Sequence, residues 1–540
     1  MKQILLLVVP PMVAFFVAMA SGALGQGGDE VLYNGIVLPQ TWPPRIQELT
    51  RERMPLPYLD APPAVIPIDV GRQLFVDDFL VDETTLERTF HSAEYYPDNP
   101  VLTADRPWEQ EGGPTAMVFS DGVWYDPADG LFKMWYMGGY CLSTCYATSK
   151  DGIHWEKPEL DVQPGTNVVQ GDHRDSATVW LDLREKDPAK RFKLFRTDND
   201  GGWAVCVHFS ADGIHWGEPV IRSGPCGDRT TVFYNPFRDV WVYSLRASAP
   251  GMGRSRRYWE NKDVVAGARW EKDEAPLWVG ADERDPERED LKTTPQLYNL
   301  DAVAYESLMV GLFTIWRGQP TDRAKPNEVC LGFSRDGFHW QRPTHEAFIP
   351  VSERQGDWNW GNVQSAGGGC LIVGDEMYFY VSARAGIPGS SQSGVCSTGL
   401  ATLRRDGFAS MDAAHEEGTL TTRPMRFSGK HLSVNVDADE GELLVEVLDE
   451  DGEPIPRLSR EKCVPIRADD TLQPVKWRGA RDLSKLAGKP VRFRFHLTNG
   501  RLYSFWVSPD MSGASRGYVA AGGPGFAGMM DTVGRGRAKG

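Results

Sequence analysis

The sequence lacks an excess of positive charge, because 58 Lys and Arg residues stand against 74 Asp and Glu residues, a formal net charge of −16. Such an acidic chain argues against nucleic acid and anionic membranes as main partners. Beyond its N-terminal stretch the chain also lacks long apolar runs, a glycine at every third position and heptad repeats, which excludes a multi-span membrane protein, collagen and a coiled coil. What remains is a chain of 540 residues, 41% of them hydrophobic, with room for a large β domain and a smaller one.

Cysteine is scarce, with 8 residues. An even number in an exported protein can indicate disulfides. However, Cys145, Cys206 and Cys330 each lie four residues before a serine in an apolar run. If these runs are equivalent strands of a repeat, the thiols are buried and far apart, so we expect mostly free core cysteines. A local bridge between Cys141 and Cys145 is the alternative.

The first residues are typical of a secretory signal peptide. Lys2 is followed by an apolar stretch over residues 4–20, and Ala23-Leu24-Gly25 is a small-residue cleavage site. We expect residues 1–25 to be removed and the mature protein to be secreted or periplasmic, with no membrane contact after cleavage. The alternative is an uncleaved anchor.

An internal repeat organises most of the chain. Ser149-Lys-Asp-Gly-Ile-His-Trp155 recurs from Ser210 to Trp216 and, with Phe in place of Ile, from Ser334 to Trp340. The repeated Asp residues are 61 and 124 residues apart, and because 124 is twice 62, a further copy is expected between the second and the third. A degenerate copy runs from Tyr258 to Trp270, and a fifth copy begins at Arg405. Asp-Gly between two apolar runs predicts a tight turn, because Gly accepts positive φ and Asp can bond its own backbone. The repeat histidines could be proposed as a metal site, but each is better explained as bonding its own turn.

Five repeats of about four strands predict a five-bladed β-propeller. The predicted second strands, rich in Val, Tyr, Phe and Trp, cover residues 132–136, 192–196, 240–246, 308–316 and 377–382. Predicted third strands precede the turns at 141–149, 204–210 and 328–334. We therefore expect an all-β protein with the propeller over residues 71–415, entered by a strand over residues 72–81.

The remaining segments predict a second domain and two irregular ends. Short strands with alternating hydrophobicity predict a C-terminal β-sandwich over residues 416–510. Residues 26–70 form a Pro-rich N-terminal extension that we expect to run over the surface. Residues 511–540 are rich in Gly, Ala and Arg, which predicts a flexible tail.

Acidic residues recur at the expected start of the inner strands, which line the central funnel of a propeller. Four inner strands are expected at Glu111, Asp175, Asp228 and Asp301, and the fifth carries amides, Asn362 and Gln364. Carboxylates gathered in one concave site raise each other's pKa and divide into acid and base roles, as glycoside hydrolysis requires. The alternative is that these acids cap loops or pair with Arg174 and Arg229.

Substrate contacts are predicted around the same funnel. Arg174, Arg229, Asn362 and Gln364 could bond sugar hydroxyls. Aromatic rings nearby could stack on sugar faces, and the candidates are Trp108, Trp316, Trp358 and Trp360. We expect no cofactor and no catalytic metal, although several funnel oxygens could ligate a structural Ca²⁺ ion.

With these turns, the five-blade period and the C-terminal sandwich, residues 70–510 resemble the five-bladed glycosidase superfamily of glycoside hydrolase families 32 and 43. In particular, the chain resembles exported family-32-like proteins of planctomycete-type bacteria. The resemblance implies three acids on successive inner strands: a base or nucleophile, a pKa-tuning Asp and a general acid Glu. By position these are Glu111, Asp175 and Asp228, with Asp301 as a fourth candidate.

The chain departs from the family pattern in two places. The Asn-Asp-Pro-Asn-Gly motif of family 32 is absent, and the third inner strand has Asp228 where the family has Glu. Glu306 is the nearest strand-borne Glu and is added as a candidate acid. The leading hypothesis is an exported glycoside hydrolase that cleaves a terminal bond of a poly- or oligosaccharide with funnel carboxylates. The alternatives are a non-catalytic carbohydrate-binding propeller and a structural interaction protein.

Overall fold

The structure, a computed structural model, describes residues 30–536. Nearly all regular structure in this range is β, with one α-helix, α1 (Pro57–Asp60). Short 3-10 helices are η1 (Pro107–Gln110), η2 (Pro188–Lys190), η3 (Ala266–Ala268), η4 (Arg460–Lys462), η5 (Ser484–Leu486) and η6 (Gly534–Gly536). The expected signal peptide over residues 1–25 lies outside the described residues. Between residues 30 and 536, no helix is long and apolar enough to cross a membrane.

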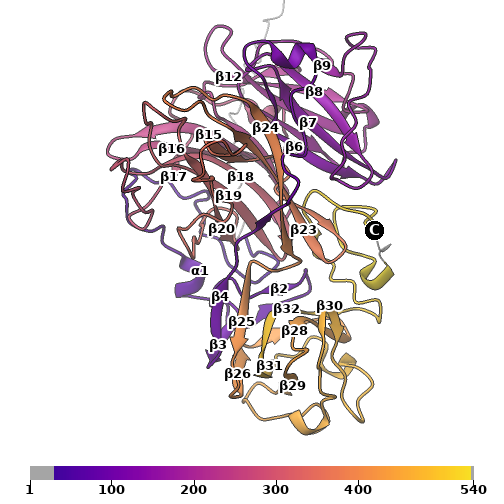
Figure 1. Cartoon of the computed structure of the whole chain (residues 1–540). Coiled ribbons are helices and arrows are strands. Elements are labelled where there is room, and N and C mark those ends of the chain that lie inside the picture. Colours follow the sequence, from indigo (N-terminus) through magenta and orange to yellow (C-terminus); the bar gives the residue numbers. More distant parts are fainter. Residues whose placement is uncertain (1–29, 537–540) are drawn as a thin grey trace, which may run out of the picture.

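Five antiparallel sheets follow one another between residues 116 and 404, numbered here in chain order (Figure 1). The first contains β6 (Ala116–Asp126), β7 (Leu131–Gly138), β8 (Ser143–Ser149) and β9 (Val168–Gln170). The second contains β10 (Ala177–Leu181), β11 (Phe192–Asp198), β12 (Ala204–Ser210) and β13 (Ile221–Arg222). The third contains β14 (Thr231–Asn235), β15 (Val240–Ala249), β16 (Gly253–Asn261) and β17 (Leu277–Val279).

The fourth and fifth sheets each recruit a strand from one end of the chain. The fourth contains β18 (Gln296–Glu306), β19 (Leu308–Trp316), β20 (Asn327–Ser334) and the distant β33 (Tyr518–Val519). The fifth contains β21 (Asn362–Ser365), β22 (Leu371–Val373), β23 (Glu376–Arg384), β24 (Cys396–Arg404) and the early strand β5 (Glu94–Tyr95). The predicted second strands are confirmed, since they fall within β7, β11, β15, β19 and β23. Of the predicted third strands, 204–210 and 328–334 fall within β12 and β20, and 141–149 begins two residues before β8.

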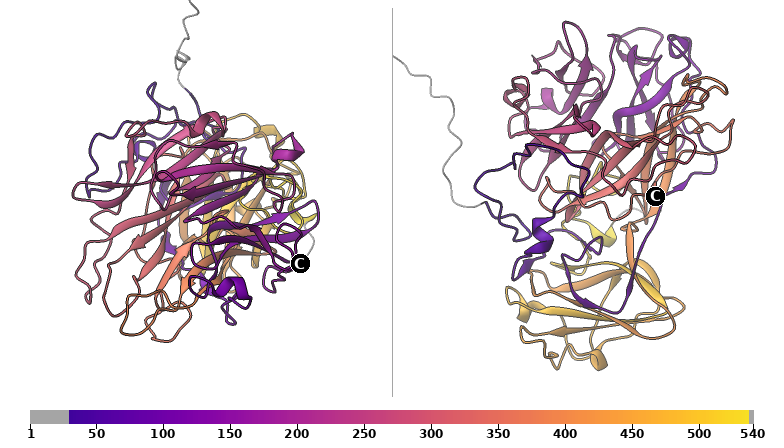
Figure 2. Two further views of the ribbon diagram at one scale, coloured as in Figure 1. Left: turned by 90° about the horizontal axis from the view of Figure 1, so that it is seen from above. Right: turned by 90° about the vertical axis from the view of Figure 1, so that its left-hand side faces the viewer.

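The first strands of the five sheets form a continuous set of contacts. Strand β6 contacts β10, β10 contacts β14, β14 contacts β18, β18 contacts β21, and β21 contacts β6 again. The sheets therefore surround one axis, which the view from above shows best (Figure 2). Strands β7, β11 and β19 are almost wholly buried, because neighbouring sheets cover both of their faces.

The repeated turns after the third strands are built alike. The carboxylate of Asp151 accepts the backbone N–H groups of Ile153 and His154, both at 2.9 Å, and Asp212 and Asp336 do the same in their turns. The Nδ1 atom of each turn histidine lies 2.7 Å from its own Asp, so the predicted local role of these histidines is confirmed. In the degenerate copy between Tyr258 and Trp270, Asp263 accepts hydrogen bonds from the backbone N–H groups of Val265 and Ala266. All eight cysteines are free, as expected.

The other end of the chain contributes two further sheets around a second hydrophobic core. One contains β30 (Asp469–Pro474), β28 (His431–Asp437), β32 (Gly500–Ser508), β25 (Ala409–Ala413) and β4 (Glu87–Phe90), with β2 (Gln73–Leu74) paired to β32. The other contains β29 (Glu442–Leu448), β31 (Arg492–Thr498), β26 (Gly418–Thr422) and β3 (Val81–Thr84). These sheets lie below the five sheets in Figure 1.

The prediction of a single strand over residues 72–81 that leads into the first sheet is wrong. Strands β2, β3 and β4 pair instead with the C-terminal strands, and β1 (Ile66–Pro67) pairs in parallel with β27 (Met425–Arg426). The apolar side chains of this segment, Phe75 and Phe79, complete the second core. Pairing partners that lie more than 300 residues away leave no trace in the local pattern.

The prediction of a flexible tail from residue 511 is also wrong over the described residues. Strand β33 pairs with β18, and Phe526 and Asp531 are buried. The glycines that indicated flexibility allow close packing instead. At Gly523, which has φ of 159°, a Cβ atom would lie 1.8 Å from the carbonyl oxygen of Ile372.

A buried ionic network lies where the five sheets meet the C-terminal sheets. Arg72 bonds Asp406 at 2.8 Å, and Arg405 bonds Glu306 at 2.9 Å and Asp531 at 3.3 Å. All five side chains are fully shielded from solvent. Glu306, a predicted catalytic acid, therefore has a structural role: it ends β18 and is held by two arginines.

Replacing Arg405 by Met would leave Glu306 and Asp531 facing one cation fewer. We expect the free energy of unfolding to fall by about 3–5 kcal/mol, because an uncompensated buried charge is costly.

The contribution of the network to stability should also depend on pH. Burial raises the pKa of Asp406, but Arg72 and Arg405 outweigh this effect and hold the pKa below its usual range. The stabilisation is therefore present above about pH 4 and is lost on acidification. Urea unfolding measures the change, with the exposed Arg354 as control: its replacement by Met should cost about 1 kcal/mol or less. If the Arg405 and Arg354 variants lost the same free energy of unfolding, the buried network would not have the proposed stabilising role.

Gly213 tests how tightly the second repeat turn packs on the first sheet. Its φ is 78°, and a Cβ atom would lie 2.5 Å from Cζ2 of Trp135. Gly201→Ala, with φ of 73° and open space, isolates the backbone strain of about 1–2 kcal/mol. We expect Gly213→Ala to cost about 1–3 kcal/mol more than Gly201→Ala, from overpacking. Gly217 has neither a positive φ nor a close neighbour, so Gly217→Ala should leave the free energy of unfolding nearly unchanged in the same assay. Equal losses of this free energy in Gly213→Ala and Gly201→Ala would rule out the contact with Trp135.

Candidate active site

Charged side chains from all five sheets meet at one end of the axis. They come from the segments just before β10 and β14, from the strands β6, β15, β16 and β18, from the end of β23 and from the loop after β19. We call this group the axial cluster; it consists of Asp121, Arg174, Asp175, Asp228, Arg229, Arg246, Arg254, Arg256, Tyr298, Asp301, Lys325 and Arg384.

An irregularity in β6 places part of this cluster. Pairing between β6 and β7 breaks between Met117 and Gly122, and Phe119 takes a positive φ of 46°. A bulge of this kind redirects side chains. As a result, the ring of Phe119 lies 3.7 Å from the guanidinium carbon of Arg229, which comes from the third sheet.

The floor of the cluster is a buried set of hydrogen bonds around Asp301. Its Oδ2 atom accepts from Ser365 at 2.6 Å and from Asn299 at 2.7 Å, and Ser120 lies 3.4 Å away. Burial raises the pKa of Asp301, although Arg229 opposes the shift. Asp301 is thus in the predicted place but is only 4% exposed, so it supports the site rather than facing a substrate.

Arg174 is not free to bind a substrate, contrary to the prediction. Its guanidinium forms a two-point ion pair with Asp121, and it also donates to Thr144 at 3.0 Å and to the carbonyl of Asp175 at 2.9 Å. Both members of the pair are fully buried. Sequence reasoning missed Asp121, although an acid in the apolar run of β6 was the available signal.

Asp175 and Asp228 are the two carboxylates of the cluster that are only partly buried. Burial and the negative charge of Asp228 raise the pKa of Asp175, against the opposing effect of Arg229, Arg174 and Arg384. Asp228 is 41% exposed along its side chain, accepts the backbone N–H of Arg229 at 2.9 Å and lies 3.3 Å from Nε of Arg246. The structure therefore brings the two predicted acids together in unequal surroundings.

Arg229 lies at the centre of the cluster without a hydrogen bond from its guanidinium to any described residue. It is 2% exposed and is within electrostatic range of Asp301, Asp175 and Tyr298. Burial lowers its pKa despite these acidic neighbours. Its predicted place in the site agrees with the structure.

Tyr298 and Lys325 form a pair that sequence reasoning missed. Nζ of Lys325 donates to the phenol oxygen of Tyr298 at 2.9 Å. Burial alone would raise the pKa of Tyr298, but the positive charges of Lys325, Arg384 and Arg229 outweigh it and bring the pKa below its usual value. A tyrosine in a β-strand is usually a core residue, so nothing in the sequence set it apart.

The remaining predicted residues lie around the cluster or away from it. Glu111 is exposed at the end of η1 and adds no contact to the cluster among residues 30–536. Trp108 bonds Asn167, next to the outer strand β9, so its predicted stacking role is not supported. Asn362 and Gln364 are buried and brace the Lys325 backbone rather than facing solvent.

In two of the predicted tryptophans an arginine lies over the indole ring, so this ring face is not open to a sugar. Arg254 lies 5.1 Å from the ring of Trp316, and Arg323 lies 5.0 Å from the ring of Trp360. Both tryptophans are less than 9% exposed. A cavity of about 660 Å³ is lined by Tyr140 and by the segments 112–115, 385–387 and 391–395.

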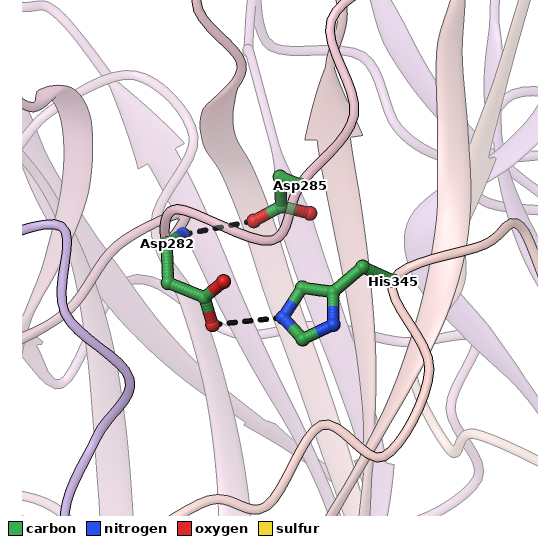
Figure 3. Close-up of side chains that lie close together, drawn as sticks. All are labelled: Asp282, Asp285 and His345. Carbon is green, nitrogen blue, oxygen red and sulfur yellow. Dashed lines mark hydrogen bonds and ion pairs between the residues drawn. The ribbon is translucent and has the colours of Figure 1, made fainter.

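A possible metal-binding group lies elsewhere. Among the described residues, only one group of three His, Cys, Asp or Glu side chains has its ligand atoms within 4.8 Å of one another. It consists of Asp282, Asp285 and His345 (Figure 3). Nε2 of His345 is 2.8 Å from Asp282, but the carboxylate of Asp285 is bound at two points by Arg342, at 2.7 and 2.6 Å. An arginine in this position opposes a second cation. The funnel oxygens that could ligate a structural Ca²⁺ ion have no comparable group of side chains in the described part of the axial cluster.

No protein-family model matches the chain, and no curated protein matches it. Similar solved structures include an N-acetylgalactosamine deacetylase from F. plautii in complex with blood group B trisaccharide, which is 17% identical with a TM-score of 0.42; the match covers 59% of this chain and 96% of that one. A thermostable family-43 glycoside hydrolase is 10% identical with a TM-score of 0.39, over 55% and 93% of the two chains. A glycosyl hydrolase from Bacteroides ovatus is 13% identical with a TM-score of 0.40, over 60% and 97%.

The pairing of Tyr298 with Lys325 can be tested by titration. Lys325→Met removes one of the cations that favour the phenolate, so the pKa of Tyr298 should rise. Ultraviolet difference absorbance follows phenolate formation, and Tyr298→Phe identifies the step that belongs to this residue. We expect that step below the ordinary tyrosine value of about 10 in the unaltered protein. A step that Lys325→Met does not move would contradict the geometry.

Proposed function

We propose that this protein is an exported glycoside hydrolase that cleaves a terminal glycosidic bond of a poly- or oligosaccharide. The observation that carries the proposal is the meeting of Asp175 and Asp228, which come from different sheets and differ in environment. Glycoside hydrolysis uses two carboxyl groups, one that protonates the leaving oxygen and one that activates water or attacks the sugar. Export is supported by the sequence of residues 1–25 alone.

The fold part of the proposal is a five-bladed β-propeller followed by a β-sandwich. The cyclic contacts of β6, β10, β14, β18 and β21 support five blades, and the pairing of β5 with β24 would join the first blade to the last. The shared core of the two C-terminal sheets supports the sandwich. In a propeller, the cluster would lie at the mouth of the axial channel, where all five blades contribute side chains.

Asp175 and Asp228 differ in their surroundings, and this difference indicates the catalytic role of each. The raised pKa of Asp175 favours the protonated form, so Asp175 is the general acid. Asp228, which accepts a backbone N–H and lies beside Arg246, is the base or nucleophile. Asp175 gives its proton to the leaving oxygen while Asp228 takes a proton from water or forms a bond to the anomeric carbon. A separation of about 6.5–9.5 Å between the carboxyl groups during reaction would mean inversion, and about 5–5.5 Å retention.

Replacing Asp175 or Asp228 by Asn tests this assignment. We expect each variant to lower kcat by about 10²–10⁴-fold on a panel of chromogenic glycosides while the unfolding midpoint stays near that of the unaltered protein. Activity should also fall as the pH rises through the raised pKa of Asp175, because the acid form is then lost. The matched control, Asp98→Asn at an exposed position, should retain full activity.

Unchanged turnover in either variant would remove that residue from the mechanism. Binding of sugars without turnover over a broad panel would favour the alternative, a non-catalytic carbohydrate-binding propeller.

A further inference from the structure

The axial cluster reverses the charge balance of the chain. The whole protein has a formal net charge of −16, yet the cluster contains more cations than carboxylates. The carboxylates are Asp121, Asp175, Asp228 and Asp301, and the cations are Arg174, Arg229, Arg246, Arg254, Arg256, Lys325 and Arg384. A local excess of positive charge in an acidic protein needs a physical reason, because like charges held together destabilise a fold.

Only two of these cations have a carboxylate partner. Arg174 pairs with Asp121, and Arg246 lies beside Asp228. The other five form no ion pair within residues 30–536; they are Arg229, Arg254, Arg256, Lys325 and Arg384. Elsewhere in the described chain, buried arginines such as Arg72, Arg335, Arg342 and Arg405 are each matched by an acid.

The unpaired cations bond neutral groups or none. Arg256 donates to the side chain of Ser244 at 2.9 Å and to the carbonyl of Arg229 at 2.7 Å. Arg384 donates to Ser393 at 3.2 Å, and its Nε atom is without a partner. Arg229 has no guanidinium hydrogen bond within the described residues, although it is nearly fully buried. A buried charged group without a partner is costly, and a bound counter-charge relieves that cost.

The pKa shifts of two axial arginines agree with this lack of counter-charge. Burial and the neighbouring Arg229 lower the pKa of Arg256 to about 9, and burial lowers the pKa of Arg229. Arg335 and Arg342, which face acids, have raised pKa values, and so does Arg384, where the effect of burial is outweighed by Tyr140, Cys396 and Tyr298. Together with their missing hydrogen bonds and ion pairs, this indicates that Arg229 and Arg256 have too little negative charge around them among the described residues.

We infer that the axial cluster binds the anionic group of an acidic sugar, a carboxylate or a sulfate ester on the ring that is cleaved. This inference rests on the proposed hydrolase function and names its substrate class. Arg254 and Lys325, which are partly exposed and flank Tyr298, would contact the anion. Arg229, Arg256 and Arg384 are more deeply buried and add to the positive field, and the charges of Asp175 and Asp228 interact with each other beside Arg229.

Paired chromogenic glycosides test the inference. Each sugar is offered to the full mature chain as the neutral hexose, the uronate and the 6-sulfate on the same 4-nitrophenyl leaving group. We expect kcat/KM for a uronate or a sulfate to exceed that of its neutral counterpart by about tenfold or more, as a charge-assisted contact would give. The uronate and sulfate series distinguish the two sources of the anion. Added salt should reduce the preference.

Variants separate the binding role from folding. Lys325→Met and Arg254→Gln, at partly exposed positions, should each remove most of the preference for the acidic sugar by raising KM. The matched control is Arg354→Gln, an exposed arginine paired with Asp357, which should keep the preference. An equal preference in the Lys325 and Arg254 variants would overturn the inference.

A binding measurement keeps the inference separate from the proposed function. Titration calorimetry of the Asp228→Asn variant with glucuronate-terminated and glucose-terminated disaccharides measures affinity without turnover. Preferential binding of the acidic disaccharide, with no hydrolysis by the unaltered protein, would support the anion site and reject the hydrolase. Hydrolysis or binding of neutral sugars at least as efficient as that of acidic ones would overturn the anion site and leave the hydrolase in place.

Discussion

The hydrogen bonds that close the buried axis are the constraint on which the rest of the structure depends. Polar groups at the centre of five sheets are shielded from bulk water, so most of them need a partner within the protein. Ser120, Asn299 and Ser365 meet this need around Asp301 and thereby join the first, fourth and fifth sheets. The hydroxyl of Ser176 lies within hydrogen-bond distance of the carbonyls of Asp228 and Thr230 and joins the second sheet to the third. Because these bonds hold the sheets together, Asp175, Asp228 and Arg229 can be brought into one cluster by backbone segments that are far apart in the sequence.

The two ends of β18 show how position along one strand decides the role of an acid. Asp301, in the middle, supports the floor of the cluster, while Glu306, at the end, is held by Arg72 and Arg405. The two networks differ in charge balance: acids outnumber arginines around Glu306, and cations outnumber acids around Arg229. In the first network every arginine has a carboxylate partner, and the network stabilises the contact between the five sheets and the C-terminal sheets. In the second, five of the cations have no carboxylate partner among residues 30–536, as expected of a site that receives a charged ligand.

Much of the strand order could be predicted from the sequence, because the Asp-Gly turns depend on local chemistry that a short motif records. The carboxylate of Asp151 bonds residues two and three positions ahead, so the motif and its structure coincide. Asp175 and Asp228 could be found for the same reason, by counting back from each turn. Arg174 and Trp108 could not be placed, since their partners Asp121 and Asn167 lie 53 and 59 residues away. The predictions for the N-terminal strands and the tail were wrong for a similar reason: β1 pairs with β27 and β33 pairs with β18, in both cases with a partner that lies more than 200 residues away.

If Asp175 and Asp228 share one electrostatic site on the axis, Asp175 should respond to the charge of Asp228. Carbon-13 NMR of labelled aspartate carboxyl groups measures this response by titrating Asp175 in the unaltered protein and in a chain with Asn at position 228. We expect Asp175 to titrate above the ordinary aspartate value of about 3.9, and its pKa to fall when the charge at position 228 is removed. A pKa at the ordinary value, or one that does not change with residue 228, would rule out the shared site.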